Sequence, residues 1–229
     1  MPIKTVFFDL IGTLAYAEKS ISFEDISDYL FERGYEVSPQ QFKASWLFVT
    51  FIDYPKHCYG SWEIFIDRVL SRLGIKVDEK TFRELVKTLE EQTYTLYPDA
   101  LVAIPQVKRL GLKTAIVTTT PRFMFYKCIQ PIEEYIDYVI TGCEAGCDKS
   151  NPKMYLKLLA LLKVKPNECV VVGDDIQLDV RIPKKLGIHT ILLDRRGSYS
   201  GTVPDIVVRD LNKAVKAMEI LNNCSPPKS

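Results

Sequence analysis

Apolar residues follow two different spacings along the chain, and these spacings divide it into segments. Residues 4–10 (KTVFFDL) form a β-branched and aromatic run that ends in a carboxylate and is broken by Gly12. This pattern predicts a buried strand that leads into a loop. From about residue 15 to residue 95, apolar residues recur at spacings of three and four, as in residues 81–91 (TFRELVKTLEE). That spacing predicts amphipathic helices, and without any strand-like run the whole segment is expected to be helical.

After Tyr97 and Pro98 the pattern changes to short apolar runs separated by segments of helix length. Strands that alternate with helices are typical of a parallel sheet with right-handed crossovers. Since one strand precedes the helical segment, we expect an α/β fold, a Rossmann-like parallel sheet flanked by helices, with an inserted all-helical cap. The predicted domains are residues 1–14 with 96–229, and residues 15–95. The later strands are expected at residues 113–117, 138–140, 169–172, 190–193 and 206–208.

Composition and charge narrow the classes of partner. Hydrophobic residues make up 47% and charged residues 26%, as in ordinary globular proteins. The net charge is +1 and no run of five or six like charges occurs, which argues against a nucleic-acid partner. No segment has the apolar length of a signal peptide or membrane span, so we expect a cytoplasmic protein, monomer or homodimer, without a membrane partner. A small anionic substrate still fits, because one local site needs only a metal and one or two cations.

Six cysteines are scattered through the chain without a CxxC pair. Free, partly buried thiols are the favoured interpretation for a cytoplasmic chain. Cys143 and Cys147 could instead approach each other, or either could be one ligand of a metal site, and these alternatives stay open here. The six are Cys58, Cys128, Cys143, Cys147, Cys169 and Cys224.

Polar residues stand where several of the predicted strands end, which is where ligands bind in parallel α/β sheets. Asp9 ends the first strand, and Thr118–Thr120 follow the strand at residues 113–117. The strand at residues 169–172 is followed by Gly173, Asp174 and Asp175, with Asp179 soon after, and Lys149 lies in a loop before a predicted helix. Carboxylates, a hydroxyl and a lysine on one rim suit an anionic substrate and a hard cation.

Four motifs in this order resemble those of the haloacid dehalogenase-like (HAD) hydrolase superfamily over almost the whole chain. A strand and a DxDGTL-like turn occur at residues 7–14 (FFDLIGTL), and a strand ending in Thr at residues 116–119 (IVTT). A lysine followed by proline occurs at residues 149–152 (KSNP), and a complete GDxxxxD motif at residues 173–179 (GDDIQLD). A helical insertion after the first motif is similar to the cap of the subfamily that includes dehalogenases and many small-molecule phosphatases.

The resemblance implies a role for each of these residues. Asp9 would be the nucleophile that forms a covalent intermediate. Mg²⁺ would be held by Asp9, Asp174 and the backbone carbonyl of Ile11, with Asp179 binding through water or orienting Lys149. Thr118 and Lys149 would stabilise oxygens of the transferring group as charge shifts. The implied substrate-binding residues are Gly12, Thr118, Thr119 and Lys149.

One position departs from the phosphatase pattern of the resembled family. Two residues after the nucleophile, phosphatases carry an aspartate that protonates the leaving oxygen, and here that position is Ile11. Such acid–base catalysis is worth about 10²–10⁴-fold. Dehalogenases also lack this aspartate, because a halide leaves without a proton. They need no metal, however, and carry Ser and Asn in the region of the Gly173–Asp179 motif, so this complete motif favours phosphate over halide.

Three functions therefore compete at this stage. The leading one is Mg²⁺-dependent hydrolysis of a small phosphate monoester through an aspartyl-phosphate on Asp9. The second is a metal-independent 2-haloacid dehalogenase in which Asp9 forms an ester, and the third is a catalytically degenerate member that binds a phosphorylated ligand.

Weaker candidates each have a favoured structural interpretation. His57 is a candidate replacement proton donor in an aromatic stretch, and Arg33 and Arg122 are candidate anion contacts that nothing separates from surface arginines. Asp175 is favoured as a helix N-cap or loop residue.

Overall fold

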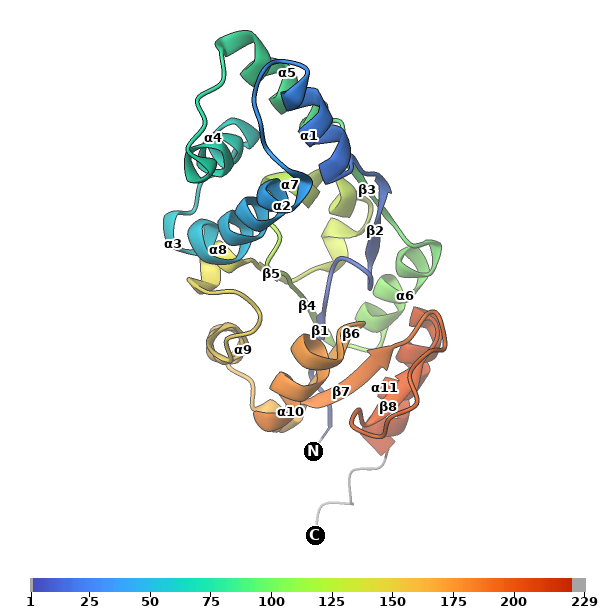
Figure 1. Ribbon diagram of the computed structural model, residues 1–229. Coiled ribbons are helices and arrows are strands. Elements are labelled where there is room, and N and C mark those ends of the chain that lie inside the picture. Colours follow the sequence, from blue (N-terminus) through green and yellow to red (C-terminus); the bar gives the residue numbers. More distant parts are fainter. Residues whose placement is uncertain (1, 224–229) are drawn as a thin grey trace.

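The computed structural model describes residues 2–223, which form an α/β core beneath a helical segment (Figure 1). Six parallel strands make one sheet in the order β5-β4-β1-β6-β7-β8. The central strand β1 has β4 on one side and β6 on the other. Strands β4 and β5 are therefore added on one side of β1, and strands β6, β7 and β8 on the other side. This confirms the predicted α/β class. The strands are β1 (Thr5–Phe8), β4 (Lys113–Val117), β5 (Tyr138–Ile140), β6 (Cys169–Gly173), β7 (His189–Leu193) and β8 (Ile206–Val208).

Both faces of the sheet are covered by helices, which explains why its strands are apolar without alternation. In β1, Val6 and Phe8 pack into one hydrophobic cluster and Phe7 into another, because successive side chains point to opposite faces. The first cluster includes residues of α6 (Pro98–Arg109), α7 (Arg122–Ile129) and α11 (Leu211–Asn223). The second includes residues of α9 (Lys153–Leu162) and α10 (Ile182–Lys185). The shorter elements are η2 (Gln130–Tyr135), α8 (Gly142–Ala145), η3 (Pro166–Glu168) and η4 (Ile176–Arg181).

The segment from residue 15 to residue 95, here called the helical insertion, builds a hydrophobic core of its own. Fully buried side chains such as Phe42, Phe65 and Leu89 form that core. Four of its helices begin with a capping Ser or Asp whose side chain accepts a backbone N–H, as the helix-start pattern requires. Its helices are α1 (Phe23–Phe31), α2 (Pro39–Phe48), η1 (Val49–Asp53), α3 (Tyr54–His57), α4 (Trp62–Leu73) and α5 (Glu79–Glu90).

The two ends of the helical insertion are strands, which corrects the expectation that residues 15–95 are helical throughout. Strands β2 (Ala15–Lys19) and β3 (Thr93–Leu96) pair antiparallel in a two-stranded ribbon. Each strand is short and mostly exposed or half-buried, so it carries little apolar signal. The ribbon forms because segments distant in the sequence meet, and local periodicity does not report such a pairing.

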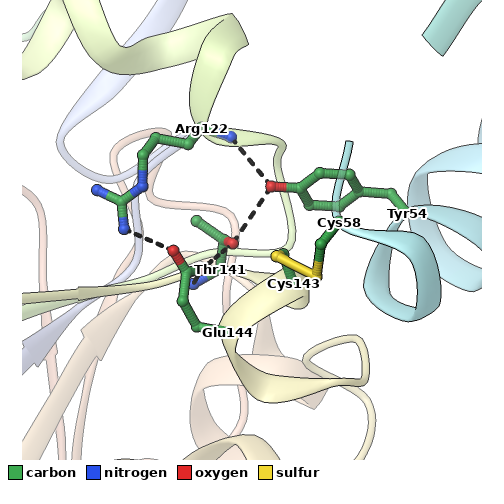
Figure 2. Close-up of a disulfide and its surroundings, with 6 residues drawn as sticks. All are labelled: Tyr54, Cys58, Arg122, Thr141, Cys143 and Glu144. Atoms are coloured by element: carbon green, nitrogen blue, oxygen red, sulfur yellow. Dashed lines mark hydrogen bonds and ion pairs between the residues drawn. A yellow bond between two sulfur atoms is a disulfide. The ribbon is translucent and has the colours of Figure 1, made fainter. Parts of the chain in front are cut away.

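A disulfide links the helical insertion to the core and corrects the expectation of free thiols at two positions. Cys58 ends α3, Cys143 lies in α8, and their Cα atoms are 5.0 Å apart across the S–S bond (Figure 2). The alternative pairing of Cys143 with Cys147 is wrong, since Cys147 is free. The true partner lies 85 residues away, a relation that spacing alone does not reveal. Cys128 and Cys169 are free, and Cys224 lies outside the described residues.

Among the described residues, no helix combines the length and the apolar character that crossing a membrane requires.

Candidate active site

Asp9 follows β1 at the carboxyl edge of the sheet, between the ends of β4 and β6. Its backbone N–H donates to the carbonyl of Val172 at 2.9 Å, which extends the β1–β6 pairing to this residue. The residue is only 8% exposed. Its Oδ1 accepts from Lys149, whereas the buried Oδ2 has no hydrogen-bond partner among the described residues. A buried carboxylate oxygen without a partner is costly, so this atom points to a ligand position.

Lys149 reaches the same position from the loop before α9. Its Nζ lies 2.5 Å from Asp9 Oδ1 and 2.5 Å from Asp179 Oδ1. Burial lowers the pKa of Lys149, but the two carboxylates more than offset burial and raise it well above its usual value. The amine therefore stays charged. Lys153, which lies four residues further along the chain, is exposed on α9.

Three carboxylates gather around this one ammonium group. Ligand oxygens of Asp9, Asp174 and Asp179 all lie within 4.8 Å of one another. Burial and then the charge of Asp9 raise the pKa of Asp174 to about 6. Burial also raises the pKa of Asp179, and Asp9 adds to the rise against the opposing charge of Lys149. Three acids sharing one cation leave negative charge uncompensated, and an all-oxygen donor set suits Mg²⁺.

Two glycines allow the acids to lie this close to the backbone. A Cβ on Gly12, which has φ +92°, would stand 2.3 Å from Asp174 Oδ2. A Cβ on Gly173 would stand 2.2 Å from Asp179 Cγ. Any other residue would displace a carboxylate, which gives a steric reason for both glycines in the sequence motifs.

Thr118 and Thr119 line the site from the end of β4, and both are buried. The Thr118 amide donates to the carbonyl of Ile140 at 3.1 Å, and its Oγ1 accepts from the Thr120 amide at 3.2 Å. The Oγ1 of Thr119 accepts the backbone N–H of Lys149 at 3.2 Å. Thr119 thus holds the lysine loop against β4.

Three supporting residues were not singled out from the sequence. Thr13 Oγ1 donates to Asp174 Oδ1 at 3.3 Å. The hydroxyl of buried Tyr155 donates to the Leu178 carbonyl at 3.1 Å and lies 3.4 Å from Asp179 Oδ1. Arg195 donates to the Thr13 carbonyl at 2.8 Å. Thr13 lies inside the first motif and could have been found there, whereas Tyr155 and Arg195 carry no local signal.

Arg195 itself is tied to the core by a carboxylate. Its guanidinium forms two bonds with Asp99, at 2.9 and 3.0 Å, and lies over the ring of Tyr97. It also lines a pocket of about 610 Å³ beside Gly12 and Asp174. The pocket gives the acid cluster one open side.

The weaker candidates engage other partners. His57 is half exposed and lies 3.4 Å from Asp53, and Arg33 pairs with Glu84 at 3.1 Å. Arg122 pairs with Glu144 at 2.8 Å. Asp175 caps η4, as expected, by accepting the amides of Gln177 and Leu178.

The side chain of Ile11 is half-buried and packs against the core, whereas the Gly12 amide donates to Ala15 at 2.7 Å. Because residue 11 is isoleucine, the site has no carboxyl group at this position. The backbone carbonyl of Ile11 remains a predicted metal ligand.

The helical insertion packs over the site side of the core. Phe123 and Met124 of α7 contact its hydrophobic cluster. Tyr54 OH of α3 lies 3.4 Å from Thr141 Oγ1 and accepts the Arg122 amide at 3.4 Å (Figure 2). The helical insertion thus contacts the core at α7 and beside α8, and it contributes none of the three carboxylates of the acid cluster.

Comparison with known proteins gives one family and several relatives. A profile described as haloacid dehalogenase-like hydrolase matches residues 3–187. The glyceraldehyde 3-phosphate phosphatase of Methanopyrus kandleri is 29% identical over 60% of this chain and 61% of that protein. A protein of the same description from Pyrococcus furiosus is 23% identical over 95% of this chain and 93% of that protein. The chain spans about three-fifths of the length of the curated relatives that it matches first.

Two solved structures share the fold over nearly the whole chain. A phosphatase from Thermococcus onnurineus aligns with a TM-score of 0.69 at 23% identity, covering 94% of this chain and 98% of that one. The L-2-haloacid dehalogenase of Xanthobacter autotrophicus aligns with a TM-score of 0.61 at 20% identity, covering 95% and 98%. One fold thus carries both chemistries, and the choice between them rests on the site.

Proposed function

This chain belongs to the haloacid dehalogenase-like hydrolase family, and we propose that it is a Mg²⁺-dependent phosphatase acting on a small phosphate monoester. The observation that carries the proposal is the cluster of Asp9, Asp174 and Asp179, whose negative charge a divalent cation would balance. Relatives that are named as phosphatases of glyceraldehyde 3-phosphate and of phosphoserine agree with phosphate chemistry. Three-carbon phosphate esters are therefore the first natural substrates to test.

In the proposed reaction Asp9 attacks phosphorus and forms an aspartyl-phosphate, which water then hydrolyses. Lys149 holds Oδ1 of Asp9 in place and leaves the partnerless Oδ2 for the metal or the phosphorus. The same ammonium supplies positive charge beside the transferring group. The helical insertion would close over the site and keep water from it during transfer.

A bound Mg²⁺ would reduce repulsion between the attacking carboxylate and the phosphate anion. Its proposed ligands are Asp9, Asp174 and the Ile11 carbonyl, with Asp179 binding through water while it orients Lys149. The raised pKa of Asp174 fits a group that shares its negative charge with a cation when the metal is present.

The phosphate oxygens would be held by donors at the end of β4 and in the loop before α9. We assign this role to the Thr118 hydroxyl and the Thr119 amide, together with Lys149. The Gly12 amide, which the resemblance also implied, donates to the Ala15 carbonyl instead. The end of β4 and the lysine loop are separate segments of the chain, so these donors meet only when it is folded. Such donors lower the barrier as negative charge moves onto the oxygens.

Ile11 restricts the class of good substrates. It cannot protonate a leaving alkoxide, so esters whose leaving group departs as a stable anion should react faster than simple alkyl esters. A 2-haloacid dehalogenase is the second candidate, since Ile11 and the shared fold fit halide departure. The acid cluster argues against it, because carbon–halogen displacement has no use for three carboxylates.

The helical insertion would act as a cover that opens for substrate and closes for reaction. The proposed division into a core of residues 1–14 and 96–229 and a cap of residues 15–95 is supported by the separate hydrophobic clusters. A cytoplasmic monomer or homodimer stays a prediction.

The test is hydrolysis of an aryl phosphate by the native chain with Mg²⁺ or with a chelator. An aryl leaving group needs little protonation, so Ile11 should not hide the activity. We expect turnover that requires Mg²⁺, is lost in Asp9→Asn and is kept in Asp67→Asn, an exposed carboxylate of α4.

Turnover without metal would contradict the proposal. Halide release from 2-haloacids in chelator would favour the dehalogenase instead. Phosphate-ester binding without any turnover would favour the degenerate member.

A further inference from the structure

We propose that Cys58 and Cys143 form a reversible redox modification site, whose disulfide fastens the helical insertion over the active site. The inference rests on the proposed function only in its effect on turnover; the covalent link itself stands on the contacts around α3 and α8. Reduction would release the insertion, and oxidation would fasten it.

The disulfide lies far from the place where the chain enters and leaves the insertion. Entry and exit run through the ribbon of β2 and β3, whereas α3 and α8 meet on the opposite side of the molecule in Figure 1. Rotation about the ribbon would separate α3 from α8. A covalent bond between them blocks this separation, so the closed arrangement is held at both sides.

The hydrogen bonds beside the disulfide are long. Tyr54 OH lies 3.4 Å from Thr141 Oγ1 and 3.4 Å from the Arg122 amide. Apolar packing also joins the insertion to the core, since Phe123 and Met124 of α7 lie against the hydrophobic cluster of the insertion. The neighbouring ion pair of Arg122 with Glu144 lies within the core, so it does not bridge to α3 (Figure 2). Hydrogen bonds of this length contribute little, so the disulfide adds a covalent restraint to a contact that otherwise consists of packing and can separate and re-form.

The two sulfur-bearing residues differ in exposure in a way that allows exchange. Cys58 is exposed and Cys143 is half-buried. Because Cys58 lies at the surface, we expect a thiolate from solution to reach its sulfur without prior unfolding. Exposed disulfides are the labile ones, in contrast to those enclosed in a core.

The chemistry balances with one external co-reactant. In reduction, a dithiol attacks Cys58 sulfur, the Cys143 thiolate leaves and takes a proton, and the second thiol of the reagent closes a cyclic disulfide as Cys58 leaves. The protein gains two electrons and two protons, and the dithiol loses them. In oxidation, a small-molecule disulfide accepts the same two electrons and is released as two thiols.

The experiment compares the full chain after treatment with oxidised glutathione and after treatment with dithiothreitol. Thiols are counted in denaturant, and the oxidised chain should show two fewer. Hydrogen exchange is then followed in the peptides that contain α3 and α7, which lie on the two sides of the contact between insertion and core. We expect these amides to exchange roughly tenfold or more faster in the reduced chain, because the insertion opens more often.

Variants separate the effect of the Cys58–Cys143 disulfide from other effects of the reagents. Cys58→Ser and Cys143→Ser should show the faster hydrogen exchange of the reduced native chain under both treatments. Cys128→Ser removes a free, half-buried thiol of α7 and should keep the native response. With aryl phosphate, oxidation should lower kcat/KM roughly tenfold in the native chain and leave Cys58→Ser unchanged.

Two results would overturn the proposed redox link: equal thiol counts after both treatments, or equal hydrogen exchange in α3 and α7 despite a difference of two thiols. If no form hydrolyses the aryl phosphate, the proposed function fails. Hydrogen exchange still tests whether the disulfide holds the insertion against the core.

Discussion

Ile11 stands where the phosphatase pattern places a proton donor, and its half-buried side chain packs against the core. We expect Ile11→Asp to raise kcat/KM for alkyl phosphates by about 10²–10⁴-fold, because the new carboxyl group can protonate the leaving oxygen. Aryl phosphates should gain far less. The measurement is the ratio of the two kcat/KM values in native and variant protein. An equal gain for both ester classes would show that the substitution acts through something other than protonation.

The acid cluster makes a prediction about Mg²⁺ and stability. In the metal-free protein the folded pKa of Asp174, about 6, lies above its unfolded value of about 3.9. Its contribution to stability is therefore full below the unfolded pKa and is lost as pH rises through 6. Asp174→Asn should remove this loss and raise the chelator-treated Tm at pH 7.5.

Metal should reverse the order of the two proteins. At a Mg²⁺ concentration of 100 times its Kd, the native chain should gain about 2.7 kcal/mol, and Asp174→Asn should gain much less. Thermal unfolding at pH 4.5 and 7.5, with Mg²⁺ and with chelator, measures both effects. A Mg²⁺-induced rise of equal size in the variant would remove Asp174 from the ligand set.

At the scale of elements, the junction between β6 and η4 depends on Gly173. A methyl group there would meet the Asp179 carboxylate at 2.2 Å. Gly173→Ala should destabilise the chain by about 1–3 kcal/mol through overpacking and should also weaken Mg²⁺ binding, since Asp179 must move.

Gly60→Ala is the matched control, because a Cβ at Gly60 meets nothing within 4 Å. Urea unfolding and calorimetric Mg²⁺ titration check both variants. A loss of stability without a change in Mg²⁺ affinity would separate Asp179 from the metal site.

Sequence patterns predicted best the short apolar runs that form strands of the sheet. Residues 114–117 and 169–172 are buried throughout, and the partly buried residues 138–140 and 206–208 are strands as well. Strands β2 and β3 were missed, since they are stabilised by pairing with each other and not by a buried apolar run. Helix starts such as Ser22 and Asp78 follow local capping rules, so they are readable without tertiary information.

At the scale of the whole molecule, the disulfide should add stability as well as restrict motion. It closes a separation of 85 residues, which limits the freedom of the unfolded chain. We expect reduction, or Cys58→Ser, to lower the free energy of unfolding by about 2–4 kcal/mol. Urea denaturation with and without dithiothreitol measures the difference, with Cys128→Ser as control. An equal free energy of unfolding for the native chain with and without dithiothreitol would contradict the prediction.

The residues of the proposed site could be predicted because the carboxyl ends of parallel strands lie at one edge of the sheet. Asp9, Lys149 and Asp174 meet there as the motif order implied. Residues that support them from elsewhere could not be predicted. Tyr155 and Cys58 act through partners that only the folded chain brings near. Site residues can therefore be predicted from the sequence where the sheet topology fixes their positions. They cannot be predicted where side-chain packing in the folded chain fixes them.

The β2–β3 ribbon has a consequence for how such a chain can change over generations. Because the chain leaves the core and returns to it through paired neighbouring strands, the segment between Lys19 and Thr93 resembles an attachment on a single stem. Its replacement by a foreign segment with similarly spaced ends would leave the six-stranded sheet intact. Chimaeras that graft the insertion of one relative onto the core of another should therefore fold, which lets the choice of substrate diverge while the catalytic core is inherited unchanged.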